Sequence, residues 1–220
     1  MKIAEKINKD SLKEYKRSLR FSLHVIGHPF DGFWDLIHEK RGSIAAANTI
    51  LIAVLLVRIW RSQMTSFMFV LYRPQNFNVL MCCLEILVPI AIGCISNWCL
   101  TTLFDGKGTL KSIYMAVCYA YTPYVLLQLP MIFISNIVTA EEGVFWTYMD
   151  RFTDIWIAIL ILSAMMMIHD YSLGKAIFAA IATAVGMLII IFILLLFFSL
   201  ISDGFAYFIS LYKEIAFRFY

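Results

Sequence analysis

Charged residues are scarce in this sequence, and the scarcity decides its class. Asp, Glu, Lys and Arg make up 15% of the 220 residues, whereas soluble domains usually carry about 25%. Hydrophobic residues make up 61%, and the mean hydropathy is +0.80. A protein interior cannot bury so much apolar sequence, but lipid can solvate it. At roughly 20 apolar residues per membrane crossing, the chain has room for about four to six crossings and for no large soluble domain.

Motifs that carry catalysis or hold cofactors are also missing. The sequence contains no G-x-S-x-G, H-E-x-x-H, Walker or dinucleotide-binding motif. Its five cysteines all lie in apolar segments without a C-x-x-C pair, and its four histidines lack the spacing of a metal site. We therefore expect a protein that is not an enzyme, that binds no metal or cofactor, and that has no nucleic-acid partner.

The first 43 residues are basic and amphipathic. Apolar residues recur at steps of three to five between Ile3 and Ile26, the spacing of one stripe along a helix, and Lys and Arg mostly occupy the other faces. Such a helix is expected either to lie on an anionic membrane surface or to pack on a partner protein. Gly27-His28-Pro29 should break it. Asp31 is the expected N-cap of a second short helix, and Ser43 the expected cap of the first span.

Long apolar runs predict the membrane spans. These are expected at about residues 44–60, 79–104, 113–134, 152–168 and 176–201. A further apolar patch, from Phe67 to Tyr72, would either prolong the first span or lie in the interface. Pro123 and Pro130 should kink or break the third span, because each proline disrupts a helical hydrogen bond. Thr109 or Ser112 is the expected cap before that span.

The expected fold class is therefore all-α, a polytopic bundle of about five transmembrane helices preceded by amphipathic interfacial helices. We divide the chain into three regions. Residues 1–43 form the basic amphipathic region, residues 44–202 the transmembrane domain, and residues 203–220 an aromatic tail expected to form a short interfacial helix.

Lys and Arg are unevenly distributed between the two sides of the predicted spans. With the N-terminus inside, the inner side carries twelve of them and the outer side six, and cytoplasmic segments are normally the richer ones. The sequence thus predicts a cytoplasmic N-terminus and, after five spans, an extracytoplasmic C-terminus. Because the first apolar run begins only near Ile44, we expect no cleavable signal peptide and a first span that is retained as an anchor.

Two polar residues interrupt the second predicted span. Glu85 is the only carboxylate near the middle of an apolar run, with no charged companion visible inside the spans. Such residues often mark ion pathways or helix contacts, although Glu85 would also fit near the membrane surface or in a protonated, hydrogen-bonded form. Asn97 is expected to hydrogen-bond across a helix interface. After the fourth span, His169 and Asp170 are expected to form a local polar pair.

Three segments, taken in order, carry a resemblance to a known family. Residues 103–126 place a Gly-rich turn, with Gly106 and Gly108, before a helix that contains Tyr119 and Pro123. Residues 168–177, IHDYSLGKAI, contain Gly174 and Lys175, and residues 28–43, HPFDGFWDLIHEKRGS, precede the first span. Over roughly residues 28–202 the chain resembles the Yip family of Ypt/Rab-interacting membrane proteins, and most of all its bacterial members.

The resemblance implies a five-span fold with a cytoplasmic N-terminus. Eukaryotic members bind Rab GTPases and other membrane proteins during vesicle transport. This sequence has HPFDGF and WDL where those members carry Asp-Leu-Tyr-Gly-Pro, and bacteria have no Rab, so the resemblance does not extend to Rab-type GTPase binding. Many bacterial members are encoded beside transport systems, which implies an accessory role in the bacterial plasma membrane.

Three functions are compatible with these features. The leading hypothesis is a non-enzymatic scaffold or accessory protein that binds membrane lipids and other membrane proteins, such as a transport system, or copies of itself. The alternative is a small transporter, channel or permease-like subunit that uses Glu85 and the proline-broken third helix. A third hypothesis is a protein that shapes or senses the bilayer through its amphipathic helix and aromatic tail.

Overall fold

The structure, a computed structural model, describes residues 2–219 except 67, 70–76, 105 and 140. The described residues form eight α-helices and no strand. Five segments among them are long and apolar enough to cross a membrane, namely Ile44–Met64, Val79–Leu103, Leu110–Ser135, Gly143–His169 and Leu173–Arg218. The expected fold class, an all-α polytopic membrane protein, is therefore confirmed.

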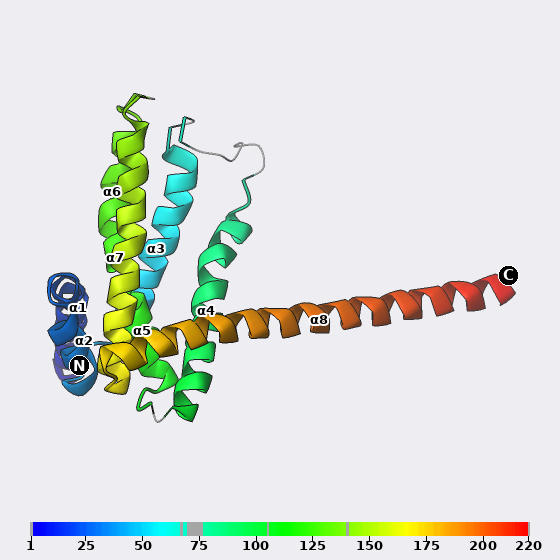
Figure 1. Ribbon diagram of the computed structural model, residues 1–220, viewed down its shortest axis with the longest axis horizontal. Helices are drawn as coiled ribbons and strands as arrows, with labels where there is room; N and C mark the ends of the chain where they lie inside the picture. Colours follow the sequence, from blue (N-terminus) through cyan, green and yellow to red (C-terminus); the bar gives the residue numbers. More distant parts are fainter. Residues whose placement is uncertain (1, 67, 70–76, 105, 140, 220) are drawn as a thin grey trace.

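Four helices run side by side and form the body of the bundle (Figure 1). They are α3 (Ile44–Met64), α4 (Val79–Leu103), α6 (Thr122–Ser135) and α7 (Gly143–His169), and α5 (Leu110–Ala120) continues the line of α6. We call the end that holds the connection from α4 to α5 the lower end, as drawn in Figure 1, and the opposite end the upper end. Three further helices, α1 (Lys2–Gly27), α2 (Pro29–His38) and α8 (Leu173–Phe219), lie around this body.

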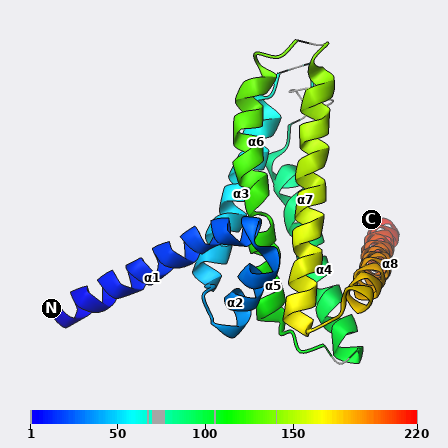
Figure 2. The same ribbon diagram turned by 60° about the vertical axis from the view of Figure 1, so that its left-hand side comes forward.

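The two N-terminal helices lie beside the lower half of the bundle. The end of α1 and the whole of α2 pack onto it, since Val25, Phe33 and Leu36 are all almost completely buried. The side chains of Tyr15 and Thr49 share a hydrogen bond of 2.7 Å between α1 and α3. Figure 2 shows the first half of α1 projecting away from the bundle. The predicted amphipathic helix therefore packs partly on the protein's own spans.

Of the two helix caps predicted in the N-terminal region, the structure contains one. Ser43 caps α3 as expected, because its side chain accepts a hydrogen bond from the backbone N–H of Ala46 at 3.1 Å. The prediction that Asp31 caps α2 was wrong, because α2 begins two residues before Asp31, at Pro29. A proline fits the first helical position without a capping partner, since it has no N–H to satisfy there and its φ angle is already helical.

The third span is broken where the sequence predicts. α5 ends at Ala120 and α6 begins at Thr122, so the break lies just before Pro123. Pro123 has no N–H for the carbonyl of Tyr119, and the hydroxyl of Thr122 donates to that carbonyl instead, at 2.7 Å. The second proline of this span, Pro130, lies inside α6 without ending it.

Both expected caps of the third span act together. Thr109 is the N-cap of α5, and its side chain accepts a hydrogen bond from the backbone N–H of Ser112. The hydroxyl of Ser112 in turn accepts a hydrogen bond from the backbone N–H of Thr109, at 2.9 Å. This reciprocal capping box satisfies two backbone donors that would otherwise be left free at the start of the helix.

The last two helices are longer than expected. α7 begins at Gly143, nine residues before the predicted start at Phe152, because the aromatic segment before the span also adopts helix. α8 continues without interruption from Leu173 to Phe219. The tail after Asp203 is therefore the end of a 47-residue helix and not a separate short one.

The connection between α3 and α4 is described only in part. α3 ends at Met64 and its backbone leaves the helix at Thr65, so the apolar patch does not prolong the first span in one continuous helix. Most of that patch, and the predicted stop at Arg73-Pro74, lie outside the described residues.

Candidate functional site

Residues from two of the recognised segments meet at the lower end of the bundle. The turn after α4 contains Gly106 and Gly108, and the turn after α7 contains Asp170. Side chains from the last turns of α4 and α7 and from the first turns of α8 complete the contact. We call this group the turn junction, and its members are Ser96, Asn97, Gly106, Lys107, Gly108, His169, Asp170, Tyr171 and Thr183.

His169 is the centre of the turn junction. Only 2% of it is exposed, and both ring nitrogens are hydrogen-bonded. The backbone N–H of Gly108 donates to Nδ1 at 3.2 Å, so Nδ1 is an acceptor and the ring proton is on Nε2. Nε2 then donates to Oδ1 of Asn97 at 3.1 Å. The contacts therefore select one neutral tautomer of the imidazole.

Asn97 extends this chain of hydrogen bonds to a third helix. Its side-chain Nδ2 donates to Oγ1 of Thr183 at 3.2 Å, and the hydroxyl of Ser96 donates to the backbone carbonyl of Thr183 at 2.9 Å. Thr183 belongs to α8, whereas His169 ends α7. The expectation that Asn97 bonds across a helix interface is confirmed, and it does so to two helices.

The two glycines of the α4–α5 turn are required by close packing. A Cβ atom at Gly108 would lie 2.5 Å from Cε1 of His169, and one at Gly106 would lie 2.7 Å from Nδ1 of the same ring. Such distances are far inside van der Waals contact, so only glycine lets the turn approach the imidazole. Gly174 differs, because nothing lies within 4 Å of a Cβ placed there.

Asp170 forms an ion pair with Lys107 and no hydrogen bond with its neighbour His169. The ammonium Nζ of Lys107 lies 2.8 Å from Oδ2 of Asp170, and this contact raises the pKa of Lys107. Asp170 caps α7 in a left-handed conformation with φ of 53°, which turns its side chain back toward the α4–α5 turn. The predicted local pair of His169 and Asp170 is therefore replaced by two separate contacts to that turn.

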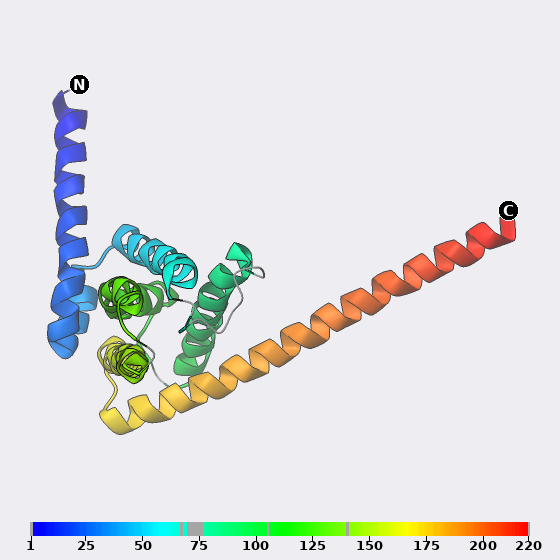
Figure 3. The same ribbon diagram turned by 90° about the horizontal axis from the view of Figure 1, so that it is seen from above.

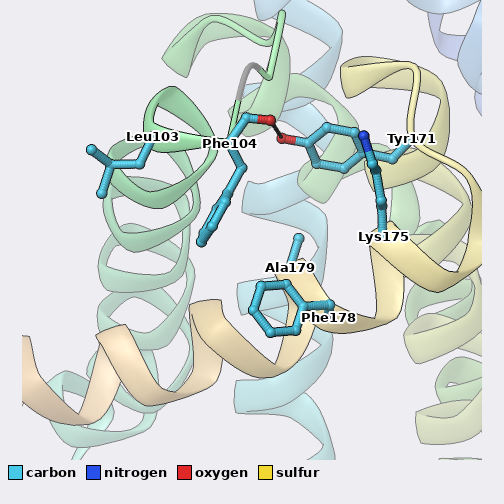
Figure 4. Close-up of a pocket in the computed structure, with 6 residues that line it drawn as sticks. All are labelled: Leu103, Phe104, Tyr171, Lys175, Phe178 and Ala179. Atoms are coloured by element: carbon cyan, nitrogen blue, oxygen red, sulfur yellow. Dashed lines mark hydrogen bonds between the residues drawn. The ribbon is translucent and has the colours of Figure 1, made fainter.

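A pocket of about 300 Å³ adjoins the turn junction. It lies between the end of α4 and the start of α8, and the hydroxyl of Tyr171 donates to the carbonyl of Phe104 at 3.0 Å along its edge. Figure 4 shows Tyr171 and Lys175 on one side, Leu103 on the other, and Phe104 above Phe178 between them. Ala179 completes the lining.

A second polar group lies in the upper half of the bundle, inside the spans. Nη2 of Arg58 lies 2.8 Å from Oε2 of Glu85, linking α3 to α4. The interpretation of Glu85 as a residue without a charged companion was therefore wrong. The companion is a basic residue in another helix, 27 positions away along the sequence, and helical periodicity does not identify neighbours on other helices.

The same level of the bundle holds a more enclosed contact. Oδ1 of Asp150 lies 2.8 Å from Nη1 of Arg61 in an ion pair and accepts a hydrogen bond from Nε2 of Gln128, also at 2.8 Å. Gln128 is 1% exposed, and its other amide atom, Oε1, has no partner among the described residues. Arg61 also lies over the ring of Trp146, 5.0 Å from its centroid. We call Arg58, Arg61, Glu85, Gln128 and Asp150 the ion-pair layer.

Other residues that the sequence singled out lie apart from both groups. Tyr119 is completely buried in α5 and shares a 2.7 Å hydrogen bond with the hydroxyl of Ser18 in α1, so it fixes the N-terminal helix to the bundle. Pro123 and Pro130 shape the third span as described above. Within the described parts of the chain, no cluster of three or more His, Cys, Asp or Glu could hold a metal ion.

Sequence reasoning missed the partners of several of these residues. Arg61 and Asp150 fall just outside the predicted spans at residues 44–60 and 152–168, although they lie within α3 and α7. Gln128 offered a signal that was overlooked, because an amide inside an apolar span needs a hydrogen-bond partner. Thr183 offered a similar but weaker signal, since threonine can satisfy its hydroxyl within its own helix.

Comparisons with known proteins agree with this architecture. A family model described as the Yip1 domain matches residues 23–196. Neither a curated protein nor a solved structure matches the chain.

Proposed function

The chain belongs to the Yip1-domain family of membrane proteins, and on this premise we propose that it is a non-enzymatic scaffold or accessory protein that binds other membrane proteins. The observation that carries the proposal is the exposure of α8. The most apolar 18-residue stretch of this helix has no buried residue, and nearly every residue after Met187 is exposed. A single protein therefore presents a long apolar surface with no partner of its own.

The exposed part of α8 suits a helix of another membrane protein. In lipid, helices associate through close packing and occasional polar contacts. α8 already packs in this way on α4, where Gly186 lies against Ser96 and Leu100, and beyond this contact it is free along its length (Figure 3). The proposal is that a partner, or a second copy, packs on the free part.

Site-specific cross-linking tests this proposal. With a photoreactive amino acid at Ile193 of α8, we expect one defined protein adduct in native membranes. The matched control is Ile155 of α7, which is similarly exposed, 60% against 57% for Ile193, and should give no such adduct. Two differently tagged copies of the chain distinguish a self-contact from a contact with another protein. Lipid adducts alone at both positions, together with a monomer in native-lipid discs, would contradict the proposal.

The transporter hypothesis has less support. It depends on Glu85 as an unpaired charge and on the break in the third span. Arg58 pairs with Glu85 at 2.8 Å, and the break is accounted for locally by Pro123 and Thr122. Neither feature then requires a transported ion.

We also propose that the N-terminus is cytoplasmic and that the protein resides in a bacterial plasma membrane. The basic N-terminal helices and the connection from α4 to α5 lie toward the lower end of the bundle (Figure 1). Lys107, Lys111 and Lys175 belong to the turns and first helical turns near this end. Support comes from the usual excess of Lys and Arg on the cytoplasmic side.

Labelling of single cysteines in intact cells tests this orientation. The five native cysteines are replaced, and one cysteine is introduced either at Lys107 or at Glu141, which lies between α6 and α7 at the upper end. A membrane-impermeant thiol reagent should label the cysteine at 141 and should reach the cysteine at 107 only after the cells are opened. The reverse pattern would show the opposite orientation.

A further inference from the structure

The pocket beside the turn junction combines one cation with apolar walls. Phe104 and Phe178 meet edge to face with centroids 5.6 Å apart, and they are 43% and 60% exposed. Leu103, next to them, is 77% exposed. These side chains lie at the ends of helices that are long and apolar enough to cross a membrane, so we expect their outer faces to meet lipid. The pocket is therefore open toward the bilayer on its apolar side.

Lys175 supplies the positive charge of the pocket. Among the residues that the structure describes, it forms no ion pair, whereas Lys107 nearby is held by Asp170 at 2.8 Å. Lys175 is the third residue of α8, and the first intrahelical bond there runs from the N–H of Ala176 to the carbonyl of Ser172. The backbone N–H groups before Ala176 have no carbonyl behind them within the helix, so this terminus adds partial positive charge beside the ammonium.

We propose that this pocket binds an anionic phospholipid, with its phosphate on Lys175 and the start of α8 and its acyl chains along Leu103, Phe104 and Phe178. This choice of ligand follows from the lining of the pocket, which combines the cation of Lys175 with apolar side chains. A soluble anion would use the cation but leave the exposed aromatic walls unoccupied, and a neutral lipid would cover the walls but leave the charge unpaired. Pockets of this size hold small ligands, and basic pockets at the cytoplasmic ends of spans suit anionic headgroups.

The bound lipid would contact three parts of the chain at once. Leu103 ends α4 and Phe104 is the C-cap that follows it, and α8 contributes Lys175, Phe178 and Ala179. Tyr171, in the turn before α8, closes the edge by donating to the carbonyl of Phe104. A headgroup here would therefore hold the start of α8 against the end of α4, at the point where α8 leaves the bundle.

The test uses the full chain in lipid discs of phosphatidylcholine with increasing phosphatidylglycerol, and native mass spectrometry counts the retained lipids. We expect Lys175→Ala to weaken retention of phosphatidylglycerol about fivefold to tenfold, as one lost basic contact predicts, and Lys175→Arg to restore most of it. Lys111→Ala is the matched control, because it changes the net charge equally at the same end of the bundle, lies outside the pocket lining and breaks no ion pair among the described residues. We expect it to change retention less than twofold.

Two outcomes would overturn the proposal. Equal losses for Lys175→Ala and Lys111→Ala would show a general effect of surface charge and no site, and unchanged retention in both would show no electrostatic contribution. A third arm adds inorganic phosphate in millimolar excess. Displacement of the lipid by phosphate alone would mean that the site recognises a free anion, which also contradicts a phospholipid site. Thermal unfolding of each variant in the same discs confirms that the fold is intact.

Discussion

Replacing Asp150 by alanine is expected to lower the free energy of unfolding by about 3 kcal/mol or more, as measured when one partner is removed from an enclosed ion pair. The same carboxylate oxygen of Asp150 pairs with the guanidinium of Arg61 and accepts a hydrogen bond from Gln128. Its loss leaves a guanidinium without its counterion inside a span. It also leaves the amide of Gln128, already lacking one partner, without the other.

The variant Asp150→Asn separates these two contributions. Asparagine keeps an acceptor for Gln128 but removes the charge that Arg61 needs, so we expect a loss between those of wild type and alanine. The combined replacement Arg61→Met and Asp150→Leu should recover much of the stability, because apolar side chains need no partner in lipid. Unfolding by increasing SDS in mixed micelles gives the free energies. If Asp150→Ala stays within about 0.5 kcal/mol of the wild type, the range of ordinary surface substitutions, the contact is not structural.

Replacing Gly108 by alanine is expected to cost about 2–4 kcal/mol, the sum of overpacking and a disturbed hydrogen bond. The new methyl group would lie 2.5 Å from both Cε1 of His169 and Cγ2 of Ile168. Neither atom is the end of a long flexible side chain, so the turn itself must move. That movement pulls the N–H of Gly108 away from Nδ1 of His169 and weakens the chain of hydrogen bonds to Asn97.

Gly174→Ala is the matched control for this prediction. It adds the same methyl group at the same end of the bundle, but nothing lies within 4 Å of it. Because Gly174 is helical, alanine there should leave the stability unchanged or raise it by a few tenths of a kcal/mol, toward the roughly 0.5–1 kcal/mol of a mid-helix position. Thermal unfolding in one detergent compares the two variants. A Gly108→Ala protein as stable as Gly174→Ala would exclude close packing as the role of the turn.

Local features of the fold were largely predictable from the sequence. A serine or threonine before an apolar run marks a helix start, and Ser43 and Thr109 both cap as expected. The break before Pro123 follows from the missing N–H of proline. These predictions depend on residues within one turn of each other, where the chain's own covalent geometry limits the possible partners.

For contacts between helices, the sequence indicated which residues would take part but not which residues they would contact. Asn97, His169, Gly106 and Gly108 were chosen for separate reasons, and the structure brings them together because the turns after α4 and α7 lie side by side. The pairing of Arg58 with Glu85 was missed, since periodicity assigns a residue to a face of its own helix but not to a neighbour. Arg61 and Asp150 were missed because the predicted first and fourth spans ended too early and began too late.

The uninterrupted length of α8 has a consequence for where the chain can reach. At 1.5 Å per residue, its 47 residues measure about 70 Å, more than twice the roughly 30 Å of the hydrocarbon layer. Figure 1 shows α8 running across the direction of the bundle helices, so this length extends sideways from the bundle and not along its spans. The end of this helix therefore lies far from the other helices, where it can meet a neighbouring protein that the bundle itself does not touch.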